Sequence, residues 1–360
     1  MATRTTVVVC GPLPPPVHGA AVVTLAVSEL LAIRCADVHL VDTAPEGRQD
    51  GLSYSTERLL AHLRACVTLL RFARRPSKTL YIGGAGGLGL VLQAAVLLVG
   101  RWLRYRCVFH HHSYAYLRRR RLTMTILLRL APSGLVHVCL ADEMAEDLWR
   151  TYRREAIVVS NAAWLRTHRA SAQGHAGDRF VIGHMSNLSV EKGLDIAIAL
   201  FETLREGGAE VELALAGPMT GHAEERLVKE VLARHTGYAR YEGYLDLAGK
   251  ERFFAGLDVF VFPSRYVNEA SPMVLFEALA AGVPCIAANV GSIDELLNGW
   301  GICLDPTEFV AQAATLLEHR RHDTQYWRSR RAAAAVAWEQ HLARTETERN
   351  RLLNAMGADV

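Results

Sequence analysis

The 360-residue sequence has no excess of glycine or proline, and no internal repeat. Gly and Pro number 28 and 12, about 11% of the chain, whereas hydrophobic residues make up 50%. This composition excludes a collagen-like, low-complexity or disordered chain, and the lack of a period of about 20–50 residues excludes a solenoid. The chain is therefore globular. Because compact domains usually hold about 100–200 residues, its length predicts two domains.

Disulfide and metal-binding patterns are also missing. The seven cysteines form an odd set without a CxxC pair or a Cys/His spacing typical of zinc sites. No DxD-type acidic pair, which would suit Mg²⁺, follows an apolar run. We therefore expect a reducing, cytoplasmic environment, no metal and no cofactor.

Nothing in the first residues resembles a secretory leader, so we do not expect secretion. The stretch that raises the question of a membrane span is Ile82 to Gly100, which carries no charge. It begins with five closely spaced glycines, which favour a turn followed by a buried helix.

The formal net charge of +3 hides an asymmetry along the chain. Residues 1–155 hold 20 Lys+Arg against 11 Asp+Glu, a net +9, which leaves −6 for the remainder. Arginines interleaved with Trp, Tyr and Leu occur at 71–78, 101–106 and 118–121. They suit a peripheral contact with an anionic membrane, at its inner face, or they are solvated arginines, and both interpretations stay open. We do not expect nucleic-acid binding, because no recognised binding module accompanies the charge.

Short apolar runs, each ending in a turn-forming residue, alternate with longer amphipathic stretches. Such runs are typical of strands buried on both faces, and the stretches between them are long enough for the crossover helices of a parallel sheet. They form two groups of five, separated by a polar segment at 166–178 that we interpret as a linker. The predicted strands are 7–10, 38–41, 80–82, 107–109, 136–140, 180–185, 212–216, 259–262, 285–287 and 301–304.

The predicted fold class is therefore α/β, with two doubly wound, Rossmann-like domains at 1–165 and 166–337. In such folds ligands bind at the carboxyl ends of the strands. We expect the site in a central cleft between the domains, built from strand-to-helix turns.

Two turns of the first domain carry candidate residues. The loop 11–19 holds three consecutive prolines and then Gly19, which lets backbone approach a ligand at a helix N-terminus; it lacks the GxGxxG pattern. His110, His111 and His112 follow another strand, where alternation prevents all three from pointing into one site. Imidazole can donate to a sugar hydroxyl or exchange a proton near neutral pH, so at least one histidine is a candidate catalytic residue. The alternative for the loop 11–19 is a rigid surface loop. The alternative for the histidines is a role in packing or simple exposure to solvent.

In the second domain, the turn after the first strand contains Asn187, Lys192 and Gly193. A lysine beside a glycine at the mouth of the sheet can reach an anionic group. The alternative is a solvated lysine at a helix start, so this turn alone does not establish the role of Lys192.

The strongest constellation follows the predicted strand 259–262. Ser271 suits an N-cap and Pro272 the first helical position, so a helix is predicted from there to Gly282. Its N-terminal N–H groups and its dipole form an anion site. The residues concerned are Ser271, Pro272, which lacks an N–H, Met273, Val274 and Leu275.

Two carboxylates flank this anion site, Glu269 in the loop before the helix and Glu277 on the helix itself. A carboxylate accepts hydrogen bonds from both hydroxyls of a vicinal diol. The combination favours a ligand that carries phosphates and hydroxyls, such as a nucleoside diphosphate sugar. Ordinary helix-surface acids are the alternative.

Four further segments accompany the E-x7-E spacing of Glu269 and Glu277, namely 189–193, 216–217, 241–244 and 291–296. With them, the sequence resembles the retaining GT-B glycosyltransferases of family 4. The resemblance is specific over about residues 180–300 and looser before them. It implies that Glu277 holds the ribose of the donor and that Glu269 contacts the donor sugar.

The resemblance also implies a basic pair on the diphosphate. Lys192 matches its second member, but Asn187 stands where the family has an arginine. Further donor contacts are implied for Gly19 and Gly217.

An active-site histidine is implied as well, for which His112 is favoured and His111 is the second candidate. The family's C-terminal helix crosses back onto the first domain, and residues 338–360 resemble it.

We therefore predict a retaining glycosyltransferase that moves a sugar from a nucleoside diphosphate sugar to a glycan, lipid-linked or small-molecule acceptor. Helix N–H groups and Lys192 would stabilise the leaving diphosphate without a metal. One alternative is a nucleotide-sugar epimerase with the same fold, which would consume donor without acceptor. Another is a non-catalytic nucleotide-sugar-binding subunit, which would bind donor without turnover.

Overall fold

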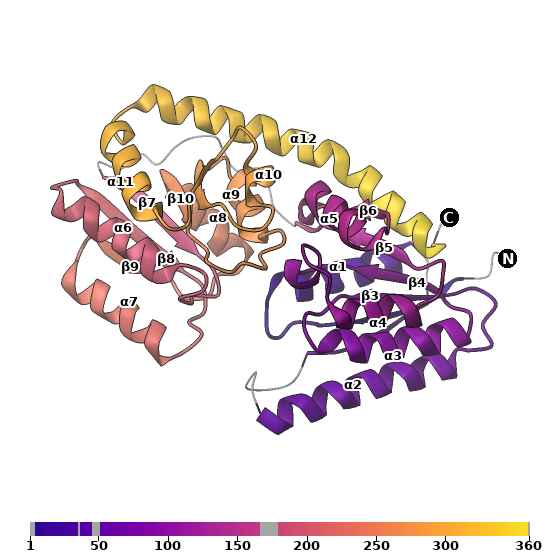
Figure 1. Cartoon of the computed structure of the whole chain (residues 1–360). Coiled ribbons are helices and arrows are strands. Elements are labelled where there is room, and N and C mark those ends of the chain that lie inside the picture. The colour runs from indigo at the N-terminus through magenta and orange to yellow at the C-terminus, as the bar shows by residue number, and fades with distance from the viewer. Residues whose placement is uncertain (1–3, 35–36, 45–50, 166–178, 359–360) are drawn as a thin grey trace. The chain divides into compact units, whose positions relative to one another are not determined.

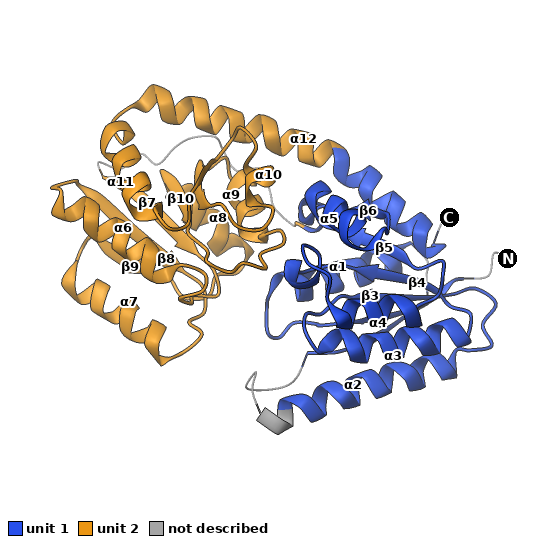
Figure 2. Cartoon of the chain, in the orientation of Figure 1, with its two compact units in different colours: residues 1–164, 344–360 blue, residues 165–343 orange. Residues whose placement is uncertain are grey.

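The structure is a computed structural model of the chain (Figure 1). It describes residues 4–34, 37–44, 51–165 and 179–358. The chain forms two compact units, coloured separately in Figure 2. Unit 1 comprises residues 1–164 and 344–360, and unit 2 comprises residues 165–343. The linker predicted at 166–178 lies outside the described residues.

Unit 1 contains a six-stranded parallel sheet with the order β2-β1-β3-β4-β5-β6. Its strands are β1 (Thr6–Gly11), β2 (Asp37–Asp42), β3 (Lys78–Gly83), β4 (Arg106–His110), β5 (Val136–Cys139) and β6 (Ala156–Val158). Its helices are α1 (Gly19–Ile33), α2 (Gly51–Arg71), α3 (Gly89–Trp102), α4 (Leu122–Leu130) and α5 (Asp142–Tyr152), with short 3₁₀ turns at Tyr114–Tyr116 and Asn161–Trp164. The strand order reverses between β1 and β3, and open α/β sheets bind ligands at such a switch point.

The end of the chain belongs to unit 1. Helix α12 (Thr324–Met356) carries residues 324–343 in unit 2 and 344–356 in unit 1. Its last turn is tied to the sheet of unit 1, because the Thr79 hydroxyl donates to Met356 O (2.7 Å) and the Thr5 hydroxyl to Gly357 O (2.7 Å). These bonds join residues more than 270 positions apart in the sequence.

Unit 2 contains a second six-stranded parallel sheet, with the order β12-β11-β10-β7-β8-β9. Its strands are β7 (Phe180–Met185), β8 (Val211–Ala216), β9 (Ala239–Tyr241), β10 (Val259–Phe262), β11 (Cys285–Ala288) and β12 (Ile302–Leu304). Its further helices are α6 (Leu194–Glu206), α7 (His222–Arg234), α8 (Leu247–Ala255), α9 (Met273–Ala280), α10 (Ile293–Leu297) and α11 (Phe309–Arg320). Counted from β9, this is the 3-2-1-4-5-6 order of Rossmann folds, whose switch point lies between the first and fourth strands, here β7 and β10.

One layer of the core of unit 2 lies between the sheet and helices α6 and α11, which contact each other. Phe201 and Leu204 of α6 and Phe309 and Leu317 of α11 are at most 1% exposed and belong to one apolar cluster with the strands. Full burial of such a side chain stabilises the fold by about 1.5–3 kcal/mol. This packing fixes the sheet whose loops carry the candidate site.

The predicted α/β class and the ten predicted strands are confirmed, with ends that differ by at most two residues. Strands β6 and β9 were not predicted. The stretch from Ile82 to Gly100 forms the end of β3, a turn and most of α3, in agreement with the prediction of a turn and a helix. Within the described part of the chain, no helix combines the length and the apolar character that crossing a membrane requires.

Candidate functional site

The candidate residues of unit 2 lie at the switch point of its sheet. Loop 186–193 follows β7 and loop 263–272 follows β10. The two loops touch at Gly193, which has φ +83° and lies so close to Pro263 that a Cβ would overlap with the proline carbonyl. Only glycine meets both conditions without strain. The side chains of both loops are thereby held at one edge of the sheet.

Lys192 and Glu269 form an ion pair that joins these two loops. The Ser264 hydroxyl lies 3.3 Å from Oε2 of Glu269, and the Lys192 ammonium lies 5.1 Å from the ring centroid of Tyr266, within cation–π range. The Glu269 side chain is 10% exposed and that of Lys192 is 27% exposed. Two residues that the sequence assigned to one donor therefore meet in the structure, although 77 positions separate them.

The backbone of Glu269 is held by the turn that follows β11. Gly291, with φ +62°, lies against the Glu269 carbonyl oxygen at a distance that leaves no room for a Cβ. The hydroxyl of the next residue, Ser292, donates to Ala270 O. The segment 291–296, which contributed to the resemblance, begins with the two residues that position Glu269.

Glu277 has a lysine partner that the sequence analysis missed. Lys250 Nζ, on α8, lies 2.7 Å from Oε1 of Glu277, on α9. The Glu277 side chain is 12% exposed and that of Lys250 is 33% exposed. Each carboxylate of the E-x7-E pair is therefore neutralised by a lysine from another element. No local pattern marks Lys250, because its partner lies 27 positions away.

Helix α9 begins at Met273 rather than at Pro272. The predicted N-cap at Ser271 is wrong: Pro272 is the N-cap, because its ψ of +118° is extended, and its carbonyl accepts the Leu275 N–H at 3.1 Å. The fixed φ of proline suits either position. The first-turn amides of the expected anion site are therefore those of Met273 and Val274.

Gly217 and Asn187 lie in neighbouring loops at the same edge. Gly217, with φ +108°, approaches the Ser186 carbonyl so closely that a Cβ would overlap with it. The Leu188 N–H donates to Pro218 O at 2.8 Å. The residues on both sides of Asn187 are thus bound to the loop that follows β8.

Arg265 is the cation of the β10 loop that could replace the charge missing at Asn187. Its guanidinium instead contacts both carboxylate oxygens of Asp195 (2.8 and 2.9 Å) and Val190 O (2.8 Å). These contacts hold Arg265 on α6 and the β7 loop, and Lys192 is the cation that reaches Glu269.

His184 is a buried polar residue of β7 that the sequence analysis did not consider. Its Nδ1 lies 3.0 Å from Val261 O, and its Nε2 lies 3.2 Å from the Ser186 hydroxyl. Burial lowers its pKa to about 4, so the ring is neutral at physiological pH. It connects β7, β10 and the start of the loop that carries Lys192.

In unit 1 the loop with Gly19 follows β1, at the switch point between β1 and β3, and the candidate histidines lie at the end of β4, the strand next to β3. Helix α1 begins at Gly19, and Nδ1 of His18 accepts the Ala21 N–H at 3.4 Å as the N-cap. Burial lowers the pKa of His18. The proline loop is anchored by the Leu13 N–H, which donates to Asp42 at the end of β2 (3.0 Å).

The histidines after β4 alternate as predicted. His110 and His112 lie on one side, with tilted rings whose centroids are 4.4 Å apart, and the Tyr81 hydroxyl lies 2.7 Å from Nδ1 of His110. Nε2 of His112 is buried and has no hydrogen-bond partner within the part of the chain that the structure describes. Burial, with a contribution from the charge of His18, lowers the pKa of His112 to about 3. A buried nitrogen of this kind is suited to bind a polar ligand.

His111 points to the other side. Its Nδ1 lies 3.1 Å from the Tyr116 hydroxyl, and its Nε2 lies 3.0 Å from Nδ1 of His137. Both ring nitrogens are therefore engaged inside the unit. Burial and the neighbouring His137 lower the pKa of His111 well below its ordinary value. These contacts favour a structural role for His111 and leave His112 as the better candidate for a ligand contact.

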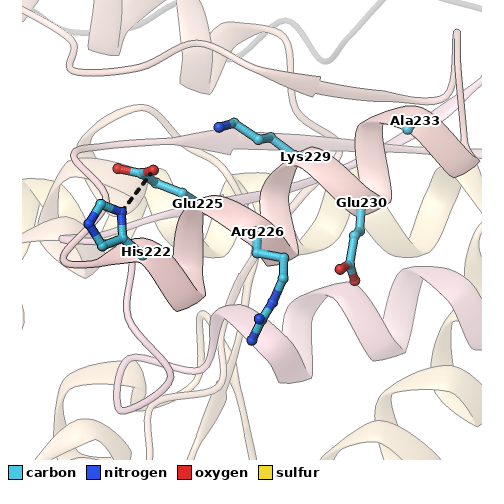
Figure 3. Close-up of a pocket in the computed structure, with 6 residues that line it drawn as sticks. All are labelled: His222, Glu225, Arg226, Lys229, Glu230 and Ala233. Carbon is cyan, nitrogen blue, oxygen red and sulfur yellow. Dashed lines mark hydrogen bonds and ion pairs between the residues drawn. The ribbon is translucent and has the colours of Figure 1, made fainter.

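A shallow hollow of about 380 Å³ lies elsewhere, along α7 (Figure 3). Its lining comes from this one helix, and the residues are His222, Glu225, Arg226, Lys229, Glu230 and Ala233. None of the predicted site residues is among them. A single exposed helix cannot enclose a ligand, so this hollow carries no functional assignment.

The part of the chain that matches a known family lies in unit 2. Residues 166–332 match the family Glycosyl transferases group 1. The putative glycosyltransferase EpsF of Bacillus subtilis is 36% identical over 124 residues, which cover 33% of this chain and 30% of EpsF. Glycogen synthase of Edwardsiella ictaluri is 33% identical over 152 residues, 41% of this chain and 30% of the synthase. Both matches span about 30% of the relative's length.

The fold is similar over a longer part of the chain. The crystal structure of HepE from Anabaena in complex with UDP-glucose superimposes with a TM-score of 0.70 and 16% identity, covering 97% of this chain and 99% of HepE. At this identity the likeness concerns the fold alone. The two parallel six-stranded sheets with their helices are those of GT-B glycosyltransferase structures.

Proposed function

We propose that the chain is a retaining glycosyltransferase that transfers a sugar from a nucleoside diphosphate sugar to an acceptor. The observation that carries the proposal is the presence of two ion pairs, Lys192–Glu269 and Lys250–Glu277, on both sides of the start of α9. They lie within the residues that match the group 1 family. Two carboxylates and two ammonium groups beside a helix N-terminus offer partners for both the hydroxyls and the phosphates of such a donor.

Glu277 is proposed to bind the ribose and Glu269 the sugar that is transferred. A carboxylate accepts a hydrogen bond from each hydroxyl of a vicinal diol. Lys250 engages Oε1 of Glu277 and fixes the orientation of the carboxylate. Lys192 holds Glu269 in the same way.

The leaving nucleoside diphosphate develops negative charge as its bond to the anomeric carbon breaks. The amides of Met273 and Val274 and the Lys192 ammonium are proposed to stabilise this charge without a metal ion. Removal of one such contact typically costs ~2.7–4 kcal/mol.

Retention follows when the acceptor oxygen attacks from the face that the diphosphate leaves. A phosphate oxygen of the leaving group then takes the acceptor proton. No nucleophile from the protein is needed in this scheme.

Unit 1 is proposed to bind the acceptor, with His112 as the active-site histidine and Gly19 as a further contact of the donor. Because the pKa of His112 is about 3, its ring is neutral near pH 7. A neutral imidazole donates at one nitrogen and accepts at the other, which suits a hydroxyl of a sugar.

The proposal is tested first by donor binding and then by the anomeric configuration of the product. The full chain is mixed with UDP-, GDP-, ADP- and dTDP-sugars, starting with UDP-glucose because HepE was crystallised with it. A true donor at about 100 times its Kd should stabilise the protein by ~2.7 kcal/mol in thermal unfolding. That donor is then supplied with lipid-linked and oligosaccharide acceptors in excess EDTA, and NMR reports the anomeric configuration of the product.

We expect a product that keeps the anomeric configuration of the donor. An inverted product would overturn the retaining mechanism, and activity that disappears in EDTA and returns with Mg²⁺ would overturn metal independence. Epimerised donor in the absence of acceptor would replace the proposal with an epimerase. Tight donor binding without turnover for any acceptor class would favour a non-catalytic subunit.

A further inference from the structure

A long part of unit 1 contains no acidic residue at all. Between positions 58 and 141 the sequence has 14 Lys+Arg and no Asp or Glu. This segment includes most of α2 and all of α3 and α4. Because the segment holds no carboxylate, any neutralisation of its positive charge has to come from other parts of the protein or from an external anion.

Helix α2 carries apolar side chains on the side that faces solvent. Leu59, Leu60, Leu63, Val67 and Leu70 are 47–64% exposed. Leu59 and Leu60 are adjacent, and the following spacings of three, four and three residues place the set on one side of the helix. The opposite side is buried through Ala61, Ala65 and Leu69. The helix is therefore apolar on its outer side as well as on its inner side, which is unusual for a solvated helix.

Helix α3, which contacts α2, also carries exposed apolar side chains. Val91, Leu98 and Trp102 are 40%, 44% and 75% exposed, and their spacings of seven and four residues place them on one side of the helix. Helices α2 and α3 are in contact and lie side by side in Figure 1. We call the outward residues of both helices the apolar face, namely 59, 60, 63, 67 and 70 of α2 and 91, 98 and 102 of α3.

Exposed arginines lie on and beside the apolar face. Arg64 and Arg71 are on α2, and Arg74 follows it, while Arg101 and Arg104 stand beside Trp102 at the end of α3. Trp flanked by Arg is typical of the boundary between lipid headgroups and acyl chains. A carboxylate does lie near this edge, because Asp37 is 3.9 Å from the guanidinium of Arg75.

We propose that the apolar face and these arginines bind the surface of an anionic lipid bilayer. A bilayer offers anionic headgroups to the arginines and an apolar boundary to the leucines and Trp102. The charged and the apolar side chains are therefore both in a favourable environment. A nucleic acid would leave the leucine stripe without a partner. This inference concerns unit 1 and does not depend on the proposed function of unit 2.

The first measurement is co-sedimentation of the full chain with vesicles at low ionic strength. Vesicles of equimolar phosphatidylglycerol and phosphatidylcholine should bind the chain, whereas pure phosphatidylcholine should bind it at least about tenfold more weakly, because two engaged arginines alone give more than that. High salt should release the protein from the anionic vesicles.

Two double variants separate charge from apolar contact. Arg71→Glu with Arg74→Glu should abolish salt-sensitive binding, and Leu63→Ser with Val67→Ser should weaken binding about tenfold or more, because two aliphatic side chains are lost. The matched control is Arg226→Glu with Lys229→Glu on α7, two exposed cations of unit 2 (Figure 3). This control makes the same change in net charge and should bind like the parent chain.

A second readout reports insertion of the apolar face. Tryptophan emission should shift to shorter wavelength when anionic vesicles are added, and Trp102→Phe should remove most of the shift, because Trp102 is 75% exposed. Thermal unfolding of each variant confirms that it is folded. Because all the substituted side chains are exposed, we expect midpoints close to that of the parent.

Three outcomes would overturn the proposal. The first is equal binding to anionic and neutral vesicles, or equal loss in the α7 control. The second is binding to duplex DNA that the arginine variant loses while vesicle binding is absent. The third is a dimer in solution that Leu63→Ser with Val67→Ser dissociates, again without vesicle binding, which would assign the apolar face to a second copy of the chain.

Discussion

Lys250 and Glu277 form an ion pair between α8 and α9, with Nζ and Oε1 2.7 Å apart. The other carboxylate of the E-x7-E spacing, Glu269, is paired with Lys192. The two pairs make the site neutral, which matters because the proposed ligand is an anion. A carboxylate without its lysine would repel the diphosphate and would be free to rotate away from the ribose.

We therefore predict that Lys250→Met weakens binding of the free nucleoside diphosphate about tenfold, or ~1.4 kcal/mol. Isothermal titration measures this, and Lys250→Arg should restore most of the affinity because it restores the charge. The corresponding nucleoside, which has no phosphates, should lose less affinity. A Lys250→Met protein with unchanged affinity for the diphosphate would show that the ion pair has no role in binding.

Substitution of Glu277 and substitution of Glu269 should have different effects on nucleoside diphosphate binding. Glu277→Ala should weaken nucleoside diphosphate binding more than Glu269→Ala, because Glu277 is assigned to the ribose and Glu269 to the sugar. In Glu269→Ala the Lys192 ammonium loses its carboxylate partner and becomes available to the phosphates, so affinity for the free diphosphate should be retained while turnover falls. Titration and steady-state kinetics test this, and equal loss of diphosphate affinity in both variants would contradict the assignment.

The elements that the sequence predicted are those with a strong local signal. The buried strands read as continuous apolar runs, and Gly282, with φ +65°, follows the end of α9 where the helix was expected to stop. The missed strands β6 and β9 are edge strands of three residues each, only half buried. In β9, Arg240 interrupts the apolar run and bonds to Glu212 and Glu242.

The candidate site likewise combines features that have a local sequence signal with features that have none. The turns and the E-x7-E spacing are local and could be found in the sequence. The partners of Glu269 and Glu277 could not, because the lysines lie 77 and 27 positions away and meet them only when the strands are ordered. The alternation of side chains along a strand predicted that the three histidines point to different sides. It did not predict that His111 is the one with both ring nitrogens engaged, because this depends on His137, which β5 brings next to His111.

The buried histidines of unit 1 predict a loss of stability at acidic pH. Burial, together with the charge of Arg154, lowers the pKa of His137 to about 4. Below about pH 6.5 the unfolded chain binds a proton at this residue that the folded chain does not, so the free energy of unfolding falls as the pH falls. At about 1.4 kcal/mol for each pH unit, this residue alone accounts for ~3 kcal/mol by pH 4.

His137→Gln should reduce the dependence of the unfolding midpoint on pH between pH 6.5 and 4, whatever its effect on stability at pH 7. The matched control is His222→Gln, since the side chain of His222 is 96% exposed. Thermal unfolding at a series of pH values compares the slopes. If His137→Gln and His222→Gln gave the slope of the parent chain, the buried histidine would not be the cause.

The last prediction concerns the charge that stabilises the leaving group. Asn187 brings no charge to the loop where the resemblance expects an arginine, and Arg265 is engaged by Asp195 and Val190. Lys192 must then carry most of the cationic stabilisation. Lys192→Ala should lower kcat/KM at least about 100-fold, which corresponds to ~2.7 kcal/mol for a lost transition-state contact.

Asn187→Ala should cost less than Lys192→Ala, because water can partly replace a neutral donor. Arg265→Ala is the matched control: it removes a cation from the adjacent loop whose contacts point to α6, so kcat/KM should stay within about threefold of the parent, a change below ~1 kcal/mol. Kinetics under identical donor and acceptor conditions compare the three variants. A Lys192→Ala enzyme with near-parent kcat/KM would remove Lys192 from the diphosphate. A severe defect in Arg265→Ala would mean that this guanidinium leaves Asp195 during the reaction and supplies the charge that position 187 lacks.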